Sequence, residues 1–253
     1  MKIGLVQINP VWENPIESIK KTDFLLSSGI ESCKVLIFPE MSLTGFTMHS
    51  ENFAEEIDGI STTYFIELAK KYKVHVFAGI IEKDEEKIYN SLVHFDNSGI
   101  ITARYRKIHP FSYAKEDKNY SAGSSVVTTK IENIKIGLSI CYDLRFPELY
   151  RHYGKERVEI MIDIANWPVP RIDHWKTLLK ARAIENQCFM IGVNRTGTDP
   201  FSTYNGCSGI YGPMGNEILS IENNEGLFTA EINSEETNEV RNKLPFLNDM
   251  KMI

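Results

Sequence analysis

Short apolar runs recur along the chain at the length expected of buried strands. The runs are rich in Ile, Val and Phe, and polar or turn-forming residues separate them. They predict strands, most of them in the interior of a sheet, at residues 3–8, 35–38, 74–81, 91–95, 134–140, 160–164 and 189–193.

Between several of these runs the apolar positions recur with helical spacing. This pattern predicts helices at residues 15–27, 61–72, 146–153 and 174–186, and Asn14 is placed to cap the first of them. Helices that alternate with apolar strands are typical of an α/β protein.

Two turn sequences add antiparallel pairing to this alternation. Asp96-Asn-Ser-Gly99 and Gly212-Pro-Met-Gly215 each join two strand-like runs and predict β-hairpins, so we expect mixed sheets. No linker divides residues 1–253, and we therefore expect one domain. From about residue 233 the chain is polar and predicts a short helix followed by an arm, which would cover a partner subunit.

Composition narrows the class of protein and its partners. Of the 253 residues, 42% are hydrophobic and 25% are charged, which is typical of a soluble globular protein. The formal net charge of −6 disfavours a nucleic-acid or anionic membrane surface, because both require a concentrated positive patch. No apolar run is long enough to predict a signal sequence or a membrane span. We expect small molecules or protein subunits as partners.

The four cysteines are widely spaced and no two form a Cys-x-x-Cys pair, which favours a reducing, cytoplasmic setting. Cys141 follows the predicted strand 134–140 and precedes Phe146-Pro-Glu148, which is typical of a first helical turn. Open α/β sheets bind ligands beyond the carboxyl ends of their strands, and helix N-terminal N–H groups favour a thiolate. Cys141 is therefore a candidate nucleophile, although a buried structural cysteine fits the same position.

Two further polar residues follow predicted strands. Glu40 comes directly after residues 35–38, at a strand end of the same kind, and is a candidate general base. Lys107 follows the strand-like run after Gly99, where its positive charge would face developing negative charge. Taken singly, the positions of Glu40 and Lys107 also fit exposed loop residues. Glu116 by itself fits an ordinary surface acid.

Together, Glu40, Lys107 and Cys141 with their flanking residues resemble the nitrilase superfamily, the carbon–nitrogen hydrolases. The resemblance spans nearly the whole chain and rests on segments in the same order, at residues 3–8, 38–40, 105–109, 140–148, 165–168, 181–187 and 208–213. The segment Cys141-Tyr-Asp-Leu-Arg-Phe-Pro-Glu148 is most similar to the ω-amidase group, which hydrolyses terminal amides of short dicarboxylic or 2-oxo acids. The resemblance implies an α-β-β-α four-layer sandwich of mixed sheets, no cofactor, and a compact homodimer paired across one helix layer.

The resemblance also implies a catalytic triad in which a carboxylate replaces histidine. Glu40 would take the thiol proton while Cys141 attacks the amide carbon and forms a thioester. The Lys107 ammonium and the backbone N–H of Tyr142 would stabilise the oxyanion. Glu40 would then protonate the leaving ammonia and activate water, and Glu116 would orient substrate or water.

Two arginines are candidates for substrate binding. Arg145 would bind the free carboxylate of an ω-amide through its planar fork, but a salt bridge to Asp143 or Glu148 fits the sequence equally well. Arg171 departs from the resemblance, because ω-amidases tend to have a small or hydroxylic residue there. A second cation at this position would change the preferred substrate length or polarity.

Three other side chains are assigned by their positions in the matched segments. Trp167 and Phe46 follow two matched strand ends and would line the pocket, although aromatic residues are also common in cores. Cys207 replaces the polar residue common before Ser208, and we expect it to contribute to packing.

Several alternatives stay open at the level of sequence. Nitriles and N-carbamoyl amides would use the same triad, and a non-catalytic metabolite-binding protein would share the fold. A Cys-His hydrolase would need His109, His152 or His174 as its base. The scattered histidines form no metal-binding motif, so no metal site is expected.

Overall fold

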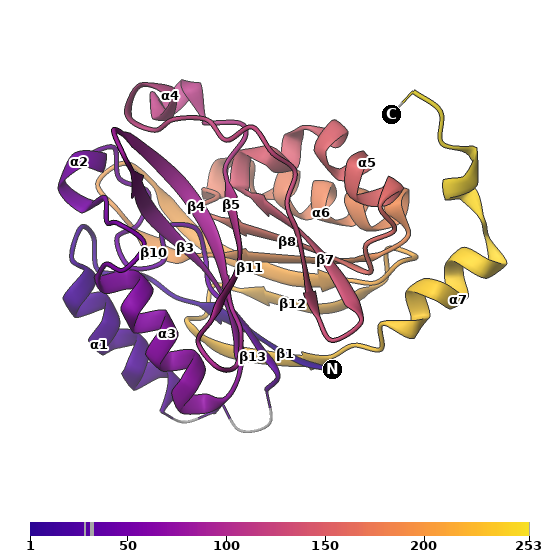
Figure 1. The fold of residues 1–253 in the computed structure, drawn as a ribbon, viewed down its shortest axis with the longest axis horizontal. Coiled ribbons are helices and arrows are strands. Elements are labelled where there is room, and N and C mark those ends of the chain that lie inside the picture. The colour runs from indigo at the N-terminus through magenta and orange to yellow at the C-terminus, as the bar shows by residue number, and fades with distance from the viewer. Residues whose placement is uncertain (28, 31–32, 253) are drawn as a thin grey trace.

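The predicted alternation of strands and helices is present in the computed structural model, which describes residues 1–27, 29–30 and 33–252. Two mixed β-sheets lie face to face at the centre of the molecule (Figure 1). No helix within the described ranges is both long and apolar enough to cross a lipid bilayer.

The first sheet has the strand order β13-β1-β2-β3-β4-β5. Strands β1, β2 and β3 are parallel, whereas β4, β5 and β13 join by antiparallel pairing. Their bounds are β1 (Lys2–Gln7), β2 (Val35–Ile37), β3 (His75–Asp84), β4 (Lys87–Phe95), β5 (Ile101–Arg106) and β13 (Gly226–Glu231).

The second sheet has the order β10-β11-β9-β8-β7-β6, and β12 also pairs with β11. Strands β7, β8 and β9 are parallel, and the outer strands pair antiparallel. The bounds are β6 (Thr128–Ile131), β7 (Ile134–Ile140), β8 (Ile160–Ala165), β9 (Phe189–Asn194), β10 (Thr196–Thr198), β11 (Thr203–Tyr211) and β12 (Glu217–Glu222).

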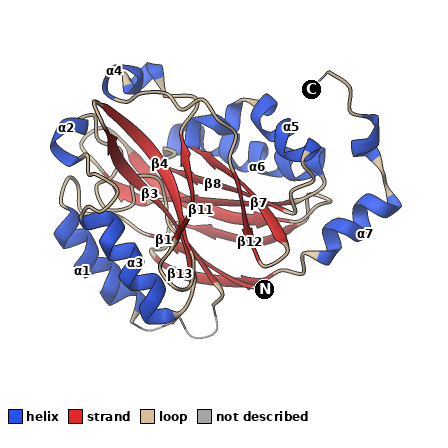
Figure 2. Cartoon of the chain, in the orientation of Figure 1, coloured by secondary structure: helices blue, strands red, loops and turns tan. Residues whose placement is uncertain are grey.

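Helices cover the outer face of each sheet and complete four layers. In Figure 1, α1 and α3 lie together on one side of the strands and α5 and α6 on the other, and Figure 2 shows these layers by element type. The predicted α-β-β-α sandwich is therefore confirmed. The helix bounds are α1 (Pro15–Leu26), α2 (Ser50–Phe53), α3 (Ile60–Tyr72), α4 (Glu116–Asn119), α5 (Pro147–Lys155), α6 (Ile172–Asn186) and α7 (Glu235–Lys243), with 3₁₀ turns at Ser112–Ala114, Cys141–Arg145, Val169–Arg171 and Phe246–Asp249.

The apolar faces of the strands bury two extensive clusters. Between the sheets, Leu5 and Phe77 pack in one cluster with Leu138. On the outer face of the first sheet, Phe65 of α3 packs in a second cluster with Val76. Burying an aliphatic or Phe side chain of this kind contributes roughly 1.5–3 kcal/mol to the stability of the fold. The apolar runs in the sequence are therefore explained by burial on both faces of the first sheet.

Local sequence signals correctly located several element boundaries. Asn14 caps α1, with its Oδ1 accepting the Glu17 amide N–H at 3.2 Å. Both predicted hairpins are present, as β4–β5 and β11–β12. The helix predicted in the C-terminal arm is α7. The β3–β4 hairpin and the strands β6 and β13 were not predicted, because their polar residues obscure the alternation and their partners stabilise them.

The sheet topology brings three chain segments to one place. The parallel strands β2, β7 and β8 end at residues 37, 140 and 165. Each is followed within a few residues by a polar or nucleophilic side chain, namely Glu40, Cys141 and Asn166.

Candidate active site

Glu40 is a fully buried carboxylate held by donors from three other segments. Its Oε1 accepts Lys107 Nζ at 2.9 Å and Asn90 Nδ2 at 2.7 Å. Its Oε2 accepts the Asn166 backbone N–H at 2.8 Å, and Asn166 Nδ2 also donates to the Glu40 carbonyl at 2.7 Å. These bonds fix the carboxylate in one orientation and satisfy a charge that burial would otherwise penalise heavily.

Lys107 joins Glu40 to a second buried carboxylate, Glu116. Lys107 Nζ lies 2.8 Å from Glu116 Oε2, and Asn90 Nδ2 donates to Glu116 Oε1 at 2.9 Å. Burial alone would lower the pKa of Lys107, but Glu116 and Glu40 hold it well above its ordinary value. Burial raises the pKa of Glu116 while Lys107 opposes that shift. The Lys107 ammonium is therefore a fixed buried cation.

Cys141 lies at a sharp corner between β7 and a 3₁₀ turn. Its φ of 50° is in the left-handed region, which non-glycine residues seldom adopt. Two buried aspartate side chains hold the corner: Asp163 Oδ1 accepts the Cys141 amide N–H at 2.9 Å, and Asp143 Oδ2 accepts the Ile140 N–H at 3.0 Å. The predicted strand-to-helix corner is present, with the 3₁₀ turn inserted before α5 begins at Pro147.

The electrostatic environment keeps the resting Cys141 thiol protonated. Burial raises its pKa well above the ordinary value, Glu40 raises it further, and Lys107 acts in the opposite direction. Burial and the Glu40 charge thus act against the thiolate that helix N-terminal N–H groups are expected to favour. Cys141 needs a base at the moment of attack.

Cys141 opens into a cavity of about 500 Å³. The predicted residues Phe46, Tyr142, Arg145, Trp167 and Arg171 all line this cavity, as does Asn166. The sequence left open whether Phe46 and Trp167 line the pocket or pack in the core. Both line the cavity, and Trp167 also packs in the buried cluster between the sheets.

Glu40, Lys107 and Glu116 are buried beside this cavity and are connected to it by neighbouring residues. Asn166 links the cavity wall to Glu40 through its hydrogen bonds. Phe46 also reaches the buried cluster, since its ring centroid lies 5.4 Å from Lys107 Nζ. Substrate bound against Cys141 would thus lie next to the buried charges.

Arg145 makes neither of the salt bridges that the sequence left open. Its guanidinium lies over the Trp167 ring, with Cζ 4.6 Å from the ring centroid, and its terminal nitrogens approach His174 Nδ1 at 3.4 Å. Asp143 is already occupied, because it accepts the Tyr105 hydroxyl at 2.7 Å and contacts His109 Nδ1 at 2.7 Å. Both oxygens of Asp143 therefore have partners other than Arg145: Oδ1 contacts His109, and Oδ2 accepts the Tyr105 hydroxyl and the Ile140 N–H.

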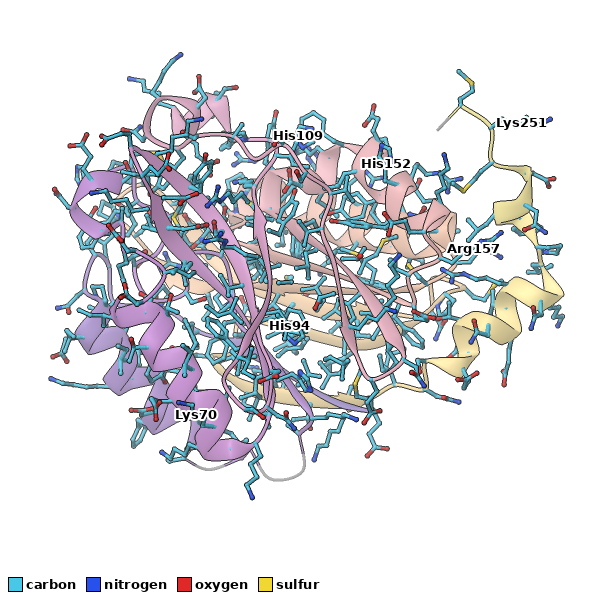
Figure 3. All side chains as sticks on the ribbon, in the orientation of Figure 1. Lys70, His94, His109, His152, Arg157 and Lys251 are labelled. Carbon is cyan, nitrogen blue, oxygen red and sulfur yellow. The ribbon has the colours of Figure 1, made fainter. Side chains whose placement is uncertain are left out.

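The histidines do not form a catalytic pair with Cys141. His109 is bonded to Asp143 and stacks on Phe146 at a centroid distance of 3.8 Å. His152 lies on α5, and Figure 3 shows both of these histidines beside the upper helices. Neither they nor His174 lie on the cavity wall. This geometry disfavours the Cys-His alternative.

Asn90, Asp163 and Asn166 are site residues that the sequence interpretation did not assign. Asp163 interrupts the otherwise apolar strand β8, and this interruption was a signal available for finding it. Asn90 lies among other polar residues of β4 and has no such signal. Asn166 lies within a segment that carried the family resemblance, at residues 165–168.

No metal site accompanies the cluster. Across residues 1–27, 29–30 and 33–252, no group of three or more His, Cys, Asp or Glu side chains is arranged to hold a metal ion.

Comparison with known proteins gives consistent similarities over the whole chain. The sequence model described as carbon-nitrogen hydrolase matches residues 2–242. The chain is 36% identical over 251 residues to the 2-oxoglutaramate amidase of Bacillus subtilis, covering 98% of this chain and 97% of that protein. It is 30% identical to the omega-amidase YafV of Escherichia coli K12, covering 98% and 96% of the two chains.

A solved structure has nearly the same fold. The crystal structure of XC1258 from Xanthomonas campestris, described as a CN-hydrolase superfamily protein with an arsenic adduct in its active site, superimposes with a TM-score of 0.95. The two sequences are 28% identical, and the match covers 100% of this chain and 98% of that one.

Proposed function

This chain belongs to the carbon–nitrogen hydrolase family, as its resemblance to the nitrilase superfamily predicted, and we propose that it hydrolyses the terminal amide of a short 2-oxo or dicarboxylic acid. The products are the carboxylic acid and ammonia. One observation carries the proposal: a buried Glu40–Lys107 pair lies beside the Cys141 thiol at a cavity that also holds two arginines. The names of the 2-oxoglutaramate amidase and omega-amidase relatives support this substrate class.

The first half-reaction forms a thioester. Glu40 takes the proton of the Cys141 thiol as the sulfur bonds to the amide carbon, and the carbonyl electron pair moves to oxygen. Lys107 Nζ and the Tyr142 amide N–H, in the first turn after the nucleophile, are the donors for this oxyanion. When the carbonyl reforms, the C–N bond breaks and protonated Glu40 gives its proton to the departing ammonia.

The second half-reaction releases the acid. Water attacks the thioester carbon and transfers a proton to Glu40, and the same donors stabilise the second oxyanion. The C–S bond then breaks, the proton on Glu40 returns to the Cys141 sulfur, and the carboxylic acid leaves. One amide and one water thus yield one acid and one ammonia, with the enzyme unchanged.

Asn166 and Glu116 have supporting roles in this scheme. Asn166 Nδ2 faces the Glu40 carbonyl, and its Oδ1 has no hydrogen-bond partner among the described residues although it is buried. Through its bonds to Glu40, Asn166 keeps the base oriented beside the cavity that it lines. Glu116 holds Lys107 and Asn90 and so keeps the oxyanion donor in place.

An ammonia-release screen tests the proposed function. The panel contains 2-oxo acid amides, dicarboxylic monoamides, nitriles and N-carbamoyl amino acids, with Cys141→Ala as the blank. We expect the acid amides to give the highest kcat/KM, and Glu40→Gln to lower kcat at least about 100-fold because it cannot move a proton. Glu67→Gln, an exposed acid on α3, is the matched control and should retain activity. Ammonia no higher than the blank on every compound would overturn the proposal.

A further inference from the structure

The cavity of Cys141 contains two guanidinium groups and no carboxylate that neutralises them. Arg145 and Arg171 both line it, and neither forms an ion pair with a carboxylate of the described residues. Burial lowers the pKa of Arg145, and the nearby charge of Arg171 lowers it further. Two like charges held close together in a partly desolvated cavity favour an anionic or electron-rich ligand between them.

The acid on the cavity wall is committed elsewhere. Asp199 lines the cavity, but its Oδ1 accepts the N–H groups of Phe201 and Ser202 at 2.8 Å. Its Oδ2 accepts the Tyr204 hydroxyl at 2.7 Å and lies 3.5 Å from Arg195 Nη1. Asp199 therefore orders its own loop and leaves the charge of Arg171 available to a ligand.

Trp167 supports both arginines. The face of its ring lies under Arg145, and its Nε1–H donates to the Arg171 carbonyl at 2.7 Å. The Arg171 amide also donates to the Pro168 carbonyl at 3.1 Å, in a turn whose backbone is restricted by Pro168 and Pro170. Trp167 thus orders the Arg145 guanidinium directly and the backbone of Arg171, whose guanidinium lies 5.6 Å from the Phe111 ring centroid. These contacts reduce the entropy lost when the two arginines bind a ligand.

We infer that Arg171 is a specificity residue that selects the amide of a 2-oxo acid over the amide of the corresponding amino acid. The inference rests on the proposed function. Arg145 binds the carboxylate at the end of the substrate remote from the amide, and Arg171 donates to the oxo oxygen on the adjacent carbon. An amino acid amide such as L-glutamine carries an ammonium on that carbon. Arg171 would repel this ammonium, so the site discriminates by an unfavourable contact as well as a favourable one.

Amides of equal length test the inference through selectivity. The substrates are 2-oxoglutaramate, glutaramate and L-glutamine, which differ only in the group beside the carboxylate. We expect Arg171→Gln to lower the ratio of kcat/KM for 2-oxoglutaramate to that for L-glutamine about tenfold or more. Arg171→Lys keeps the positive charge and should still reject L-glutamine. The matched control is Lys130→Gln, which removes an exposed cation on β6 and should leave all three values unchanged.

A second readout does not depend on amide hydrolysis. Iodoacetate and iodoacetamide alkylate the same Cys141 sulfur with loss of iodide, but only iodoacetate is an anion. The ratio of the two alkylation rates, followed by mass spectrometry with Cys141→Ala as the blank, should fall about fivefold in Arg171→Gln. It should be unchanged in Lys130→Gln.

The two readouts separate the inference from the proposed function. If the native protein releases no ammonia from any amide but the alkylation ratio falls in Arg171→Gln, the proposed function is overturned and the anion-binding pair is supported. If amides are hydrolysed but Arg171→Gln changes neither the selectivity ratio nor the alkylation ratio by more than about twofold, Arg171 does not determine specificity and the inference is overturned.

Discussion

At the scale of single residues, Asp163 is a buried acid that is bonded to the nucleophile's amide and has an unusually high pKa. It is fully buried, and desolvation raises its pKa to about 8 although Tyr150, Ser139 and the Cys141 amide donate to it. A carboxyl in this state keeps its proton at neutral pH. Its Oδ1 nevertheless accepts the Cys141 N–H, so Asp163 links the protonation state of the core to the position of the thiol.

This buried acid predicts a defined pH dependence of stability. Between about pH 4 and pH 8 the folded protein retains the Asp163 proton while the unfolded chain has lost it, so the free energy of unfolding falls as pH rises. The contribution is at most about 1.4 kcal/mol per pH unit. Asp163→Asn mimics the protonated form and should remove this slope in urea unfolding across that range. Asp249→Asn, at an exposed position, should preserve the slope, and an unchanged slope in Asp163→Asn would contradict the assignment.

At the scale of elements, the close packing of β3 against the residues after β2 positions the base. A Cβ added at Gly79 of β3 would lie 2.5 Å from the Met41 amide nitrogen and 2.8 Å from Glu40 Cα. Because these are backbone atoms, no side-chain rotation could relieve the contact. Glycine is required here so that the strand end carrying Glu40 can approach its neighbour.

Gly79→Ala should therefore affect stability and activity together. We expect the free energy of unfolding to fall by about 1–3 kcal/mol through overpacking. We also expect kcat/KM to fall by roughly 100-fold, because displacing a catalytic group by about 1 Å has an effect of this size. Denaturant unfolding and steady-state kinetics measure the two effects. Gly29→Ala is the matched control, since its nearest neighbour, Leu227 Cδ2, would lie 3.8 Å away; equal behaviour of the two variants would refute the packing argument.

At the scale of the whole molecule, α7 binds the edge opposite the candidate active site. Arg241 of α7 donates to the carbonyls of Val158 and Asn186 at 2.7 Å and 3.0 Å, and to that of Arg157 at 3.1 Å. These carbonyls lie just before β8 and β9, whereas Cys141 and Asn166 follow the carboxyl ends of their strands. Figure 3 shows Arg157 on the side of the body that faces α7.

Because α7 lies far from the candidate active site, we expect that stability and catalysis can be changed independently. Arg241→Met leaves three backbone carbonyls without their charged donor, and we expect the free energy of unfolding to fall by about 1–3 kcal/mol. Because the change lies at the far edge of the sheet, kcat/KM for the amide substrate should stay within about twofold. Lys243→Met on the exposed face of α7 is the control and should change stability by less than about 0.5 kcal/mol. A large loss of activity in Arg241→Met at a temperature where it is folded would contradict this division.

A strand or helix could be predicted where its own residues carry a clear local signal, such as apolar periodicity or a turn sequence. The run at β7 was located to the residue, because Ile and Leu occupy every second position from Ile134 to Ile140 and a turn signal ends it. In contrast, β13 has no such signal and is defined by its pairing with β1, more than 200 residues away. Within the site, Glu40, Lys107 and Cys141 were predicted through the family resemblance. Asn90 and Asp163 were not assigned, since a polar residue in a strand does not reveal its partner.

The sequence by itself determined the central strands and the long helices, the thiol at the corner after β7, and the carboxylate and lysine at two other strand ends. Only the tertiary structure decided that burial and Glu40 raise the pKa of this thiol, that Arg145 lies on Trp167 and not beside Asp143, and that Arg171 faces the same cavity. The physical reason is the separation along the chain over which each effect acts. Periodicity and capping depend on neighbouring residues, whereas desolvation and charge pairing depend on groups brought together by folding, such as Lys107 and Glu40, which are 67 residues apart in the chain.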